Sequence, residues 1–291
     1  MEKERSGAAI RSKCNICGEM KRPGPITEIA PDRWVVGDKR TRLFMILGGF
    51  FIANALIAEM IGVKLFQLEA ALGLARSSFT LLGQSDLSFV LSVGVLPWPI
   101  VFIMTDVIND YYGVRGVRFL TLLTTSLIVF MFGLLFLAIH LPPENSWWLG
   151  SSAGAGVLDM QAAFTAIFGQ GMNIILGSIT AFMIGQLIDA FVFRKLKRMT
   201  GDRKIWLRAT GSTIVSQLID SVVVTYVAFW ILRDMSFPMA TALVLTAYTY
   251  KFVVALLSTP LIYLAHAGVE TYLGKERAAE MRRQALAGSG S

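Results

Sequence analysis

The sequence predicts an all-α integral membrane protein with six transmembrane helices and with both termini in the cytoplasm. The 291 residues are 54 % hydrophobic, and their mean hydropathy of +0.59 exceeds what a soluble domain needs. Apolar segments long enough to cross about 30 Å of hydrocarbon recur along the chain. Of the 27 lysines and arginines, 23 lie in the termini and in the links after the second and fourth spans, whereas the three opposite loops carry 2.

Residues 1–42 predict a basic, poorly ordered cytoplasmic tail, because they hold ten lysines and arginines and lack the apolar core of a signal peptide. Cys14 and Cys17 have the spacing of half a thiolate zinc site. Two ligands do not close a tetrahedral site, so a pair of reduced thiols is favoured over a zinc shared between two copies of the chain. The basic charge lies mostly in the termini and in the links between spans, and no nucleic-acid partner is predicted.

The first span is expected at residues 43–64, with Asn54 and Glu59 inside an otherwise apolar helix. Glu59 lies about 24 Å along the axis from Leu43, which brings it towards the far side of the bilayer. An interfacial position and a ligand-binding role for Glu59 both stay open. Residues 65–86 are interpreted as an amphipathic connection.

The second span is expected at residues 87–111. Pro97 and Pro99 are predicted to interrupt its hydrogen bonding halfway along and to kink it beside Trp98.

Three polar side chains end this second span. Asp106, Asn109 and Asp110 are spaced i, i+3 and i+4, so on a helix they share one face. A carboxylate at membrane depth costs several kcal/mol unless it meets water, a partner or a ligand, which makes this face a candidate site. The alternative is a solvated helix end in the cytoplasmic interface.

The third span, residues 119–140, is interpreted as a scaffold that faces lipid and neighbouring helices. Residues 141–160 contain Trp147 and Trp148 and no basic residue, which predicts an external loop with an interfacial anchor. The next apolar segment, residues 162–193, is longer than one crossing. The GQGMN break at 169–173 divides it into a short interfacial helix and a fourth span.

A QLID tetrapeptide occurs in the fourth span and again in the fifth, which is expected at residues 211–232. It places Gln186 and Asp189 on one face, and Gln217 and Asp220 on another. Because the two helices run in opposite directions, the pairs resemble an inverted repeat around a central site, although so short a match also arises by accident. Asp220 lies near the midplane by helical rise.

The last span, residues 238–265, carries Tyr248, Tyr250 and Lys251 in its middle. Lys251 is too deep to reach the interface and needs a carboxylate partner. Asp220 is the first choice because the depths match, and Glu59 is the second. Residues 43–266 thus form the transmembrane domain, followed by a basic cytoplasmic tail at 267–291.

Four motifs together resemble the vitamin-uptake, or queuosine precursor, transporter family of bacterial membrane proteins: WPIVFIMTDVINDYYG, GQLIDAFVF, WLRATGSTIVSQLIDS and YKFVVALLSTPLIY. The resemblance covers residues 43–272, whereas the CxxC tail has no counterpart. It implies a location in the bacterial inner membrane and import of a 7-deazaguanine base for salvage into the modified tRNA nucleoside queuosine. The base would be 7-cyano-7-deazaguanine or 7-aminomethyl-7-deazaguanine.

A planar base of this kind suits the polar residues of the spans. Carboxylates accept its adjacent N–H groups, amides address its carbonyl and ring nitrogen, and aromatic rings stack on its faces. The candidate substrate-binding residues are Trp98, Asp106, Asn109, Asp110, Gln186, Asp189, Gln217, Asp220, Tyr248 and Lys251, with Asn54 and Glu59 as additional candidates.

Three classes of function compete. A secondary carrier or facilitator is favoured, because no Walker loop is present. The alternative is a substrate-binding membrane subunit that needs separate ATPase partners. An intramembrane enzyme is disfavoured, since neither HExxH nor GxSxG occurs, and no cofactor is predicted. A homodimer is compatible with the sequence, but no stripe of small residues locates its interface.

Overall fold

The computed structural model describes residues 37–144, 159–169, 172–200, 205–231 and 234–287. The chain divides into two units, Met1–Asp38 and Lys39–Ser291, and the elements below all belong to the second. Cys14 and Cys17, Trp147 and Trp148, and nearly all of the predicted N-terminal tail lie outside the described residues.

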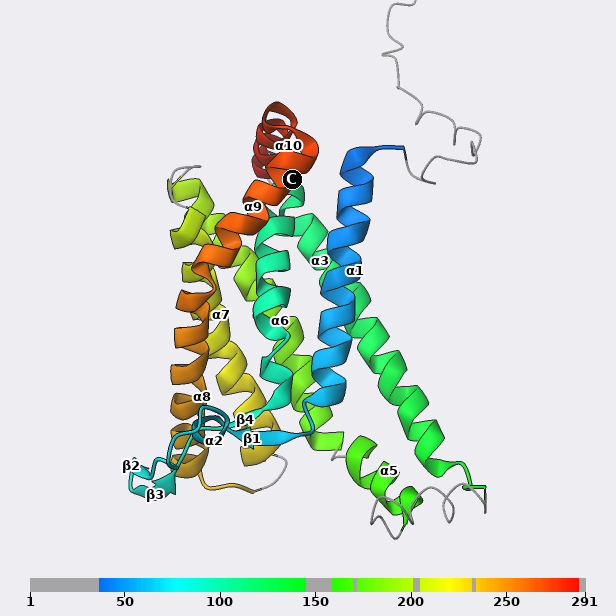
Figure 1. Ribbon diagram of the computed structural model, residues 1–291, viewed down its shortest axis with the longest axis vertical. Coiled ribbons are helices and arrows are strands. Elements are labelled where there is room, and N and C mark those ends of the chain that lie inside the picture. Colours follow the sequence, from blue (N-terminus) through cyan, green and yellow to red (C-terminus); the bar gives the residue numbers. More distant parts are fainter. Residues whose placement is uncertain (1–36, 145–158, 170–171, 201–204, 232–233, 288–291) are drawn as a thin grey trace, which may run out of the picture. The chain divides into compact units, whose positions relative to one another are not determined.

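The described part of the chain is mostly helical (Figure 1). Its long helices are α1 (Lys39–Ile61), α3 (Trp98–His140), α6 (Met172–Thr200), α7 (Ile205–Thr225) and α8 (Phe237–Leu257). A π-helical segment η2 (Tyr226–Ile231) prolongs α7. Within the described ranges, four helical stretches are long and apolar enough to cross a membrane, namely Lys39–Ile61, Val93–His140, Ile205–Ile231 and Phe237–Leu257. This is therefore a multi-pass membrane protein built from helices.

Helix α3 consists of two arms that meet at Gly113. The backbone of Gly113 has φ 72° and ψ −178°, a conformation that is almost restricted to glycine. The ribbon reverses its direction at this point (Figure 1). The first arm, residues 98–112, and the second arm, residues 114–140, therefore correspond to the predicted second and third spans.

The predicted kink in the middle of the second span is wrong. Pro97 is the N-cap of α3 and Pro99 lies in its first turn, where a helix tolerates proline because the missing N–H would have no partner there. The helix thus begins at Trp98 rather than at residue 87.

Short strands, which the sequence analysis did not anticipate, occupy much of the connection between α1 and α3. Strand β1 (Leu65–Gln67) pairs antiparallel with β4 (Val90–Ser92). Strand β2 (Phe79–Leu81) pairs with β3 (Gln84–Leu87) across a two-residue turn in which Leu82 and Gly83 both have positive φ. One-turn helix α2 (Leu68–Ala71) follows β1, and a 3-10 turn η1 (Val93–Val95) follows β4.

The predicted division of the fourth apolar segment is confirmed. Helix α5 (Met160–Phe168) ends before the GQGMN break and α6 begins within it. The fifth helix starts at Ile205, six residues before the expected position.

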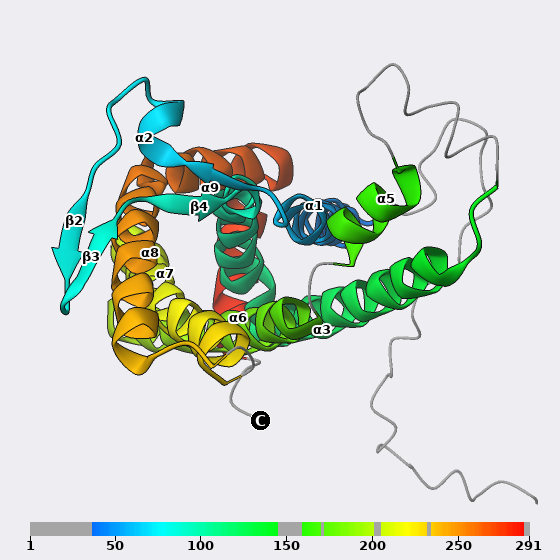
Figure 2. The ribbon, with the colours of Figure 1, turned by 90° about the horizontal axis from the view of Figure 1, so that it is seen from below.

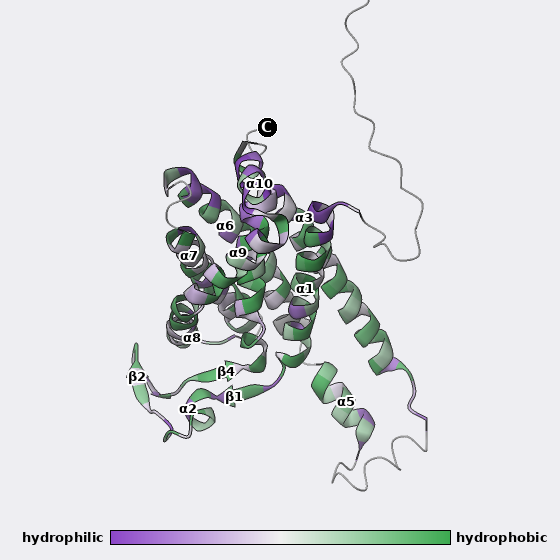
Figure 3. Ribbon diagram, turned by 45° about the horizontal axis from the view of Figure 1, so that its top comes forward, coloured by the Kyte–Doolittle hydropathy of each residue, from purple (hydrophilic) through white to green (hydrophobic). Residues whose placement is uncertain are grey.

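The core lies between α1, α3, α6, α9 and α10, with Phe51, Tyr111, Phe182 and Phe193 among its buried side chains. The second arm of α3 instead exposes large apolar residues along its length, including Phe119, Leu122, Phe130, Leu134 and Leu137. Figure 3 shows hydrophobic residues along the long helices and hydrophilic residues gathered near α10 and the end of α6. An exposed apolar helix face of this kind suits contact with lipid.

Residues 267–287, which belong to the predicted basic C-terminal tail, are helical and pack against the rest of the second unit. Helix α9 (Thr259–Leu273) continues the last span and α10 (Lys275–Ala287) follows it. Ala278 and Met281 of α10 are buried. A Cβ atom at Gly113 would lie 3.1 Å from the carbonyl oxygen of Ala285, so α10 covers the turn between the two arms of α3.

Candidate functional site

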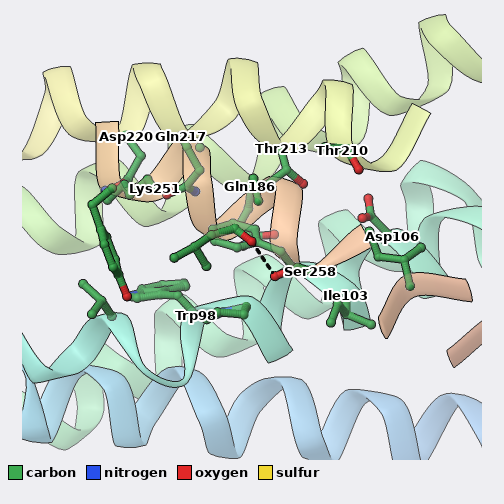
Figure 4. Close-up of a pocket in the computed structure, with 18 of the residues that line it drawn as sticks. Trp98, Ile103, Asp106, Gln186, Thr210, Thr213, Gln217, Asp220, Lys251 and Ser258 are labelled. Carbon is green, nitrogen blue, oxygen red and sulfur yellow. Dashed lines mark hydrogen bonds and ion pairs between the residues drawn. The ribbon is translucent and has the colours of Figure 1, made fainter. Parts of the chain in front are cut away.

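An open cavity lies between the first arm of α3 and helices α6, α7, α8 and α9 (Figure 4). Figure 2 shows these helices gathered around one region of the bundle. The space between the lining side chains, together with the open mouth, amounts to about 720 Å³. The aromatic and polar residues of the lining are Trp98, Phe102, Asp106, Phe182, Gln186, Thr210, Thr213, Gln217, Asp220, Tyr250, Lys251 and Ser258.

Aromatic side chains form one wall of the cavity. The ring of Trp98 lies 5.7 Å from that of Phe102, with their planes 25° apart, and 5.7 Å from the ring of Phe182. Because α3 begins at Trp98, the two prolines around it fix where this ring enters the cavity. A planar ligand can stack on such a wall.

An ion pair stands at the opposite side. Lys251 Nζ of α8 lies 2.5 Å from Asp220 Oδ2 of α7. The Lys251 side chain is 21 % exposed and the Asp220 side chain is 20 % exposed. The predicted Asp220–Lys251 pair is thereby confirmed. Gln217 lies three residues before Asp220 on α7 and lines the same cavity. The pair offers a planar ligand both an acceptor and a cationic donor.

Asp106 lies at another part of the lining, near Thr210 and Thr213 of α7 (Figure 4). Its side chain is 1 % exposed, and neither carboxyl oxygen has a hydrogen-bond partner among the described residues. Gln186 of α6 also lines the cavity, and its Oε1 accepts a hydrogen bond of 2.9 Å from Thr105 Oγ1.

Two candidates lie beside the cavity rather than in its lining. Asp189 is fully buried and accepts a hydrogen bond of 3.1 Å from Ser216 Oγ. The Asn109 amide donates to the carbonyl oxygen of Ala190 at 3.0 Å, which ties α3 to α6.

Asp110 is the centre of a buried cluster of charges. Its carboxylate lies 2.5 Å from Lys197 Nζ, 2.9 Å from Arg208 Nη2, 3.6 Å from His266 Nδ1 and 3.8 Å from Arg282 Nε. Asp110 and Arg208 are both fully buried. The alternative of a solvated helix end is therefore wrong for Asp110, and the cluster joins α3 to α6, α7, α9 and α10.

Three further candidates do not line the cavity and form hydrogen bonds elsewhere in the structure. Tyr248 donates to the carbonyl oxygen of Ile214 at 3.3 Å. Asn54 donates to the carbonyl oxygen of Phe50, one turn earlier in α1. Glu59 accepts a hydrogen bond of 2.7 Å from Ser178 of α6.

Several lining residues are not among the residues predicted from the sequence, although helical spacing indicates them. Lys251, Ala255, Ser258 and Ile262 follow each other at steps of three and four, and Tyr250 precedes Val254 by one turn. On α7 the same spacing joins the lining residues Thr210, Thr213, Gln217 and Asp220. Among the described residues, no group of three or more histidines, cysteines and acids is placed to hold a metal ion.

Comparison with known proteins places this arrangement in a family. Residues 92–265 match the family model described as "Putative vitamin uptake transporter". The chain is 33 % identical over 181 residues to the "Probable queuosine precursor transporter" of Bacillus subtilis (strain 168), covering 60 % of this chain and 71 % of that protein. It is 28 % identical over 149 residues to the "Queuosine precursor transporter" of Escherichia coli (strain K12), covering 50 % and 58 %. No solved structure matches the chain. The family model spans more than half of the sequence, and the chain therefore belongs to the vitamin uptake transporter family.

Proposed function

We propose that this protein is a secondary carrier that imports a queuosine precursor, a 7-deazaguanine base, across the bacterial inner membrane. Family membership and the names of the two relatives support the substrate class. The observation that carries the proposal is the cavity itself, which combines a stacking wall at Trp98 with the Asp220–Lys251 pair between helices.

The chemistry of the lining suits a guanine-like base. The ring stacks on Trp98, while Asp220 accepts two adjacent N–H groups and Lys251 or Gln217 donates to the carbonyl oxygen. A purine without the matching N–H donors leaves the Asp220 carboxylate without hydrogen bonds in the complex. Such a purine should therefore bind more weakly than a guanine-like base. Six of the residues predicted from the sequence line the cavity and are proposed to bind the base: Trp98, Asp106, Gln186, Gln217, Asp220 and Lys251. Tyr250 is proposed in place of Tyr248, because Tyr250 lines the cavity.

The proposed topology has six crossings with both termini in the cytoplasm. The crossings are α1, the two arms of α3, α6, α7 with η2, and α8 continued by α9. The reversal at Gly113 supports separate second and third crossings, and the distribution of lysine and arginine supports the orientation.

Uptake into liposomes tests the function. The purified full-length chain is reconstituted without other proteins, and entry of labelled 7-cyano-7-deazaguanine is measured with and without unlabelled deazaguanine, guanine or folate. We expect uptake that deazaguanine blocks and folate does not. Binding without uptake would instead indicate a subunit that needs ATPase partners, and a chemically altered base would indicate an enzyme.

A matched pair of variants tests the site. Asp220→Asn removes the carboxylate of the cavity and is expected to abolish uptake while the protein still reaches the membrane. Asp86→Asn is the control, because Asp86 lies in the connection between α1 and α3 and its ion pair with Arg76 is exposed. Full uptake by Asp220→Asn would overturn the assignment of the site.

A further inference from the structure

Two hydrogen bonds bring Asp106 and Asp189 to the same part of the α3–α6 interface. Thr105 bonds to Gln186 at 2.9 Å, and Asn109 bonds to the carbonyl oxygen of Ala190 at 3.0 Å. Each bond joins residues 81 positions apart, so the first arm of α3 and this part of α6 run parallel in constant register. Asp106 and Asp189 lie within the section that these two bonds enclose.

Both carboxyl groups are withdrawn from water and from counter-charges. Asp106 is 1 % exposed and Asp189 is 0 % exposed. Both oxygens of Asp106 and Oδ2 of Asp189 have no hydrogen-bond partner among the described residues. Within the same residues no ion pair reaches either group, whereas Asp110, one turn further along α3, is paired with Lys197 and Arg208.

The charged groups around the pair do not neutralise it. Those that act on Asp106 are Asp189 from α6, Asp110 from its own helix and Arg208 from α7. Arg208 bonds to Asp110 at 2.9 Å, and His266 of α9 also faces Asp110. From α7, Asp189 meets the hydroxyl groups of Ser212 and Ser216, which are polar but uncharged. The ion pair of the cavity joins Asp220 to Lys251 and includes neither Asp106 nor Asp189.

Two neighbouring carboxylates in a buried, low-dielectric interior destabilise each other when both are ionised, because like charges repel and neither group is exposed to solvent. The cost of a buried charge without a partner falls when the group takes up a proton. Asp106 lines the cavity, whereas Asp189 does not. Asp106 can therefore contact a base in the cavity, while Asp189 lies behind it as a second carboxyl group outside the lining.

We propose that Asp106 and Asp189 form a proton-binding carboxyl pair that couples entry of the base to entry of a proton. This rests on the proposed carrier function. A protonated Asp106 donates its O–H to an acceptor on the base, such as the ring nitrogen or the carbonyl oxygen, so proton and base stabilise each other in the cavity. When the proton leaves towards the cytoplasm, the repulsion between the carboxylates returns and the base loses this donor.

Infrared difference spectroscopy tests the proton site without any substrate. The purified full-length protein is titrated in H₂O and D₂O, and the C=O band of a protonated carboxyl group is followed. We expect this band in the wild type and its loss or reduction in both Asp106→Asn and Asp189→Asn. Asp189→Glu, which retains a carboxyl group, is expected to keep the band, and Asp86→Asn is the exposed control. An unchanged band in both asparagine variants would overturn the proposal.

Transport in liposomes tests the coupling. Uptake of labelled 7-cyano-7-deazaguanine is compared with an acidic exterior, with equal pH on both sides, and with a sodium gradient, while an enclosed dye reports internal pH. We expect an acidic exterior to accelerate uptake and base entry to acidify the interior. In Asp189→Asn, uptake should become equally fast with and without the pH gradient. Acceleration by sodium alone, or a pH response that survives in Asp189→Asn, would overturn the coupling.

The two experiments separate the proton pair from the carrier function. A wild type that shows the carboxyl band but does not transport any deazaguanine would overturn the proposed substrate and the coupling, while the proton site itself would stand. A wild type that transports the base without the band and without a pH response would keep the carrier function and overturn the proton pair.

Discussion

Asp106 and Asp110 lie one turn apart on α3, yet their surroundings differ completely. Asp110 meets cationic or ring nitrogens from α6, α7, α9 and α10, whereas Asp106 has no hydrogen-bond partner among the described residues. The sequence placed both on one polar face, which is correct. It could not separate their roles, because the partners of Asp110 lie 87 or more positions away in the chain.

Replacing Asp110 is expected to damage stability strongly. Asp110→Asn leaves Lys197 and Arg208 buried without their counter-charge, and breaking a buried pair in this way costs about 3–5 kcal/mol. Thermal unfolding of the detergent-solubilised protein measures the loss. Asp86→Asn breaks a pair whose side chains are 53 % and 65 % exposed, so its cost should not exceed about 1 kcal/mol. Equal melting of the two variants would contradict this view of Asp110.

The Asp220–Lys251 pair is expected to show compensation. Lys251→Met leaves the Asp220 carboxylate without its partner and should lower the unfolding temperature. Adding Asp220→Asn removes the unpaired charge and should recover part of the loss, although the double variant lacks the groups needed for uptake. Thermal unfolding of both variants decides the question, and a double variant no more stable than Lys251→Met would show that the pair is not coupled.

Depth along a helix predicted this pair correctly. Helical rise puts Asp220 and Lys251 at the same depth in the membrane, and their opposite charges then predict that they pair. The same reasoning could not decide between Tyr248 and Tyr250, because the choice depends on how α8 is rotated against α7. Tyr248 bonds to Ile214 of α7, and Tyr250 lines the cavity.

Among the elements, the helical segments were easier to predict than their ends. Hydropathy located the apolar cores, and the GQGMN break separated α5 from α6 as expected. The apolar run continues from residue 87 without interruption, and hydropathy therefore predicts that Pro97 and Pro99 lie inside a span. The run is shared between β4, η1 and α3, and hydropathy alone does not distinguish an apolar strand from a helix of the same length.

The turn between the arms of α3 should not tolerate a side chain. Gly113→Ala forces a non-glycine residue into a backbone conformation that costs about 1–3 kcal/mol, and the added Cβ lies close to Ala285 of α10. Gly133→Ala is the matched control, because nothing lies within 4 Å of its added Cβ and alanine favours a helix. Thermal unfolding should show a loss only for Gly113→Ala. A neutral result there would contradict the strained turn.

The connection between α1 and α3 is expected to loosen in acid. Hydrogen bonds from Ser77 Oγ and from the Phe89 amide to Glu69 Oε1 lower the pKa of Glu69. A carboxyl group with a lowered folded-state pKa stabilises the fold above its unfolded pKa, and this contribution is lost as pH falls through the folded value. Limited proteolysis at decreasing pH should show cleavage within residues 65–92. Glu69→Gln should remove most of the pH dependence, and an unchanged pH profile would contradict the role of Glu69.

At the scale of the whole molecule, the balance of basic residues gave a topology before any contact was known. What it could not give is the packing of the C-terminal segment, because α10 has a polar sequence and, among its residues of described burial, Ala278 and Met281 are the buried apolar side chains. The inverted repeat suggested by the two QLID motifs and the homodimer both stay predictions.

Removing residues 1–35 is expected to preserve uptake, since α1 begins at Lys39 and, within the described part of the chain, the cavity lining runs from Val95 to Ile262. Uptake per molecule of the truncated protein in liposomes, compared with the full-length chain, measures this. A well-expressed, monodisperse truncation that has lost uptake would assign the N-terminal segment a part in transport.

Helix α10 is fastened to the point where the two arms of α3 meet, and it is also tied to α9 by the Arg282–Glu270 pair. In the proposed carrier, a rearrangement of the first arm is therefore expected to displace α10 as well. A fluorophore on an exposed position of α10, such as Arg283→Cys after replacement of Cys14 and Cys17, would report that motion without touching the cavity.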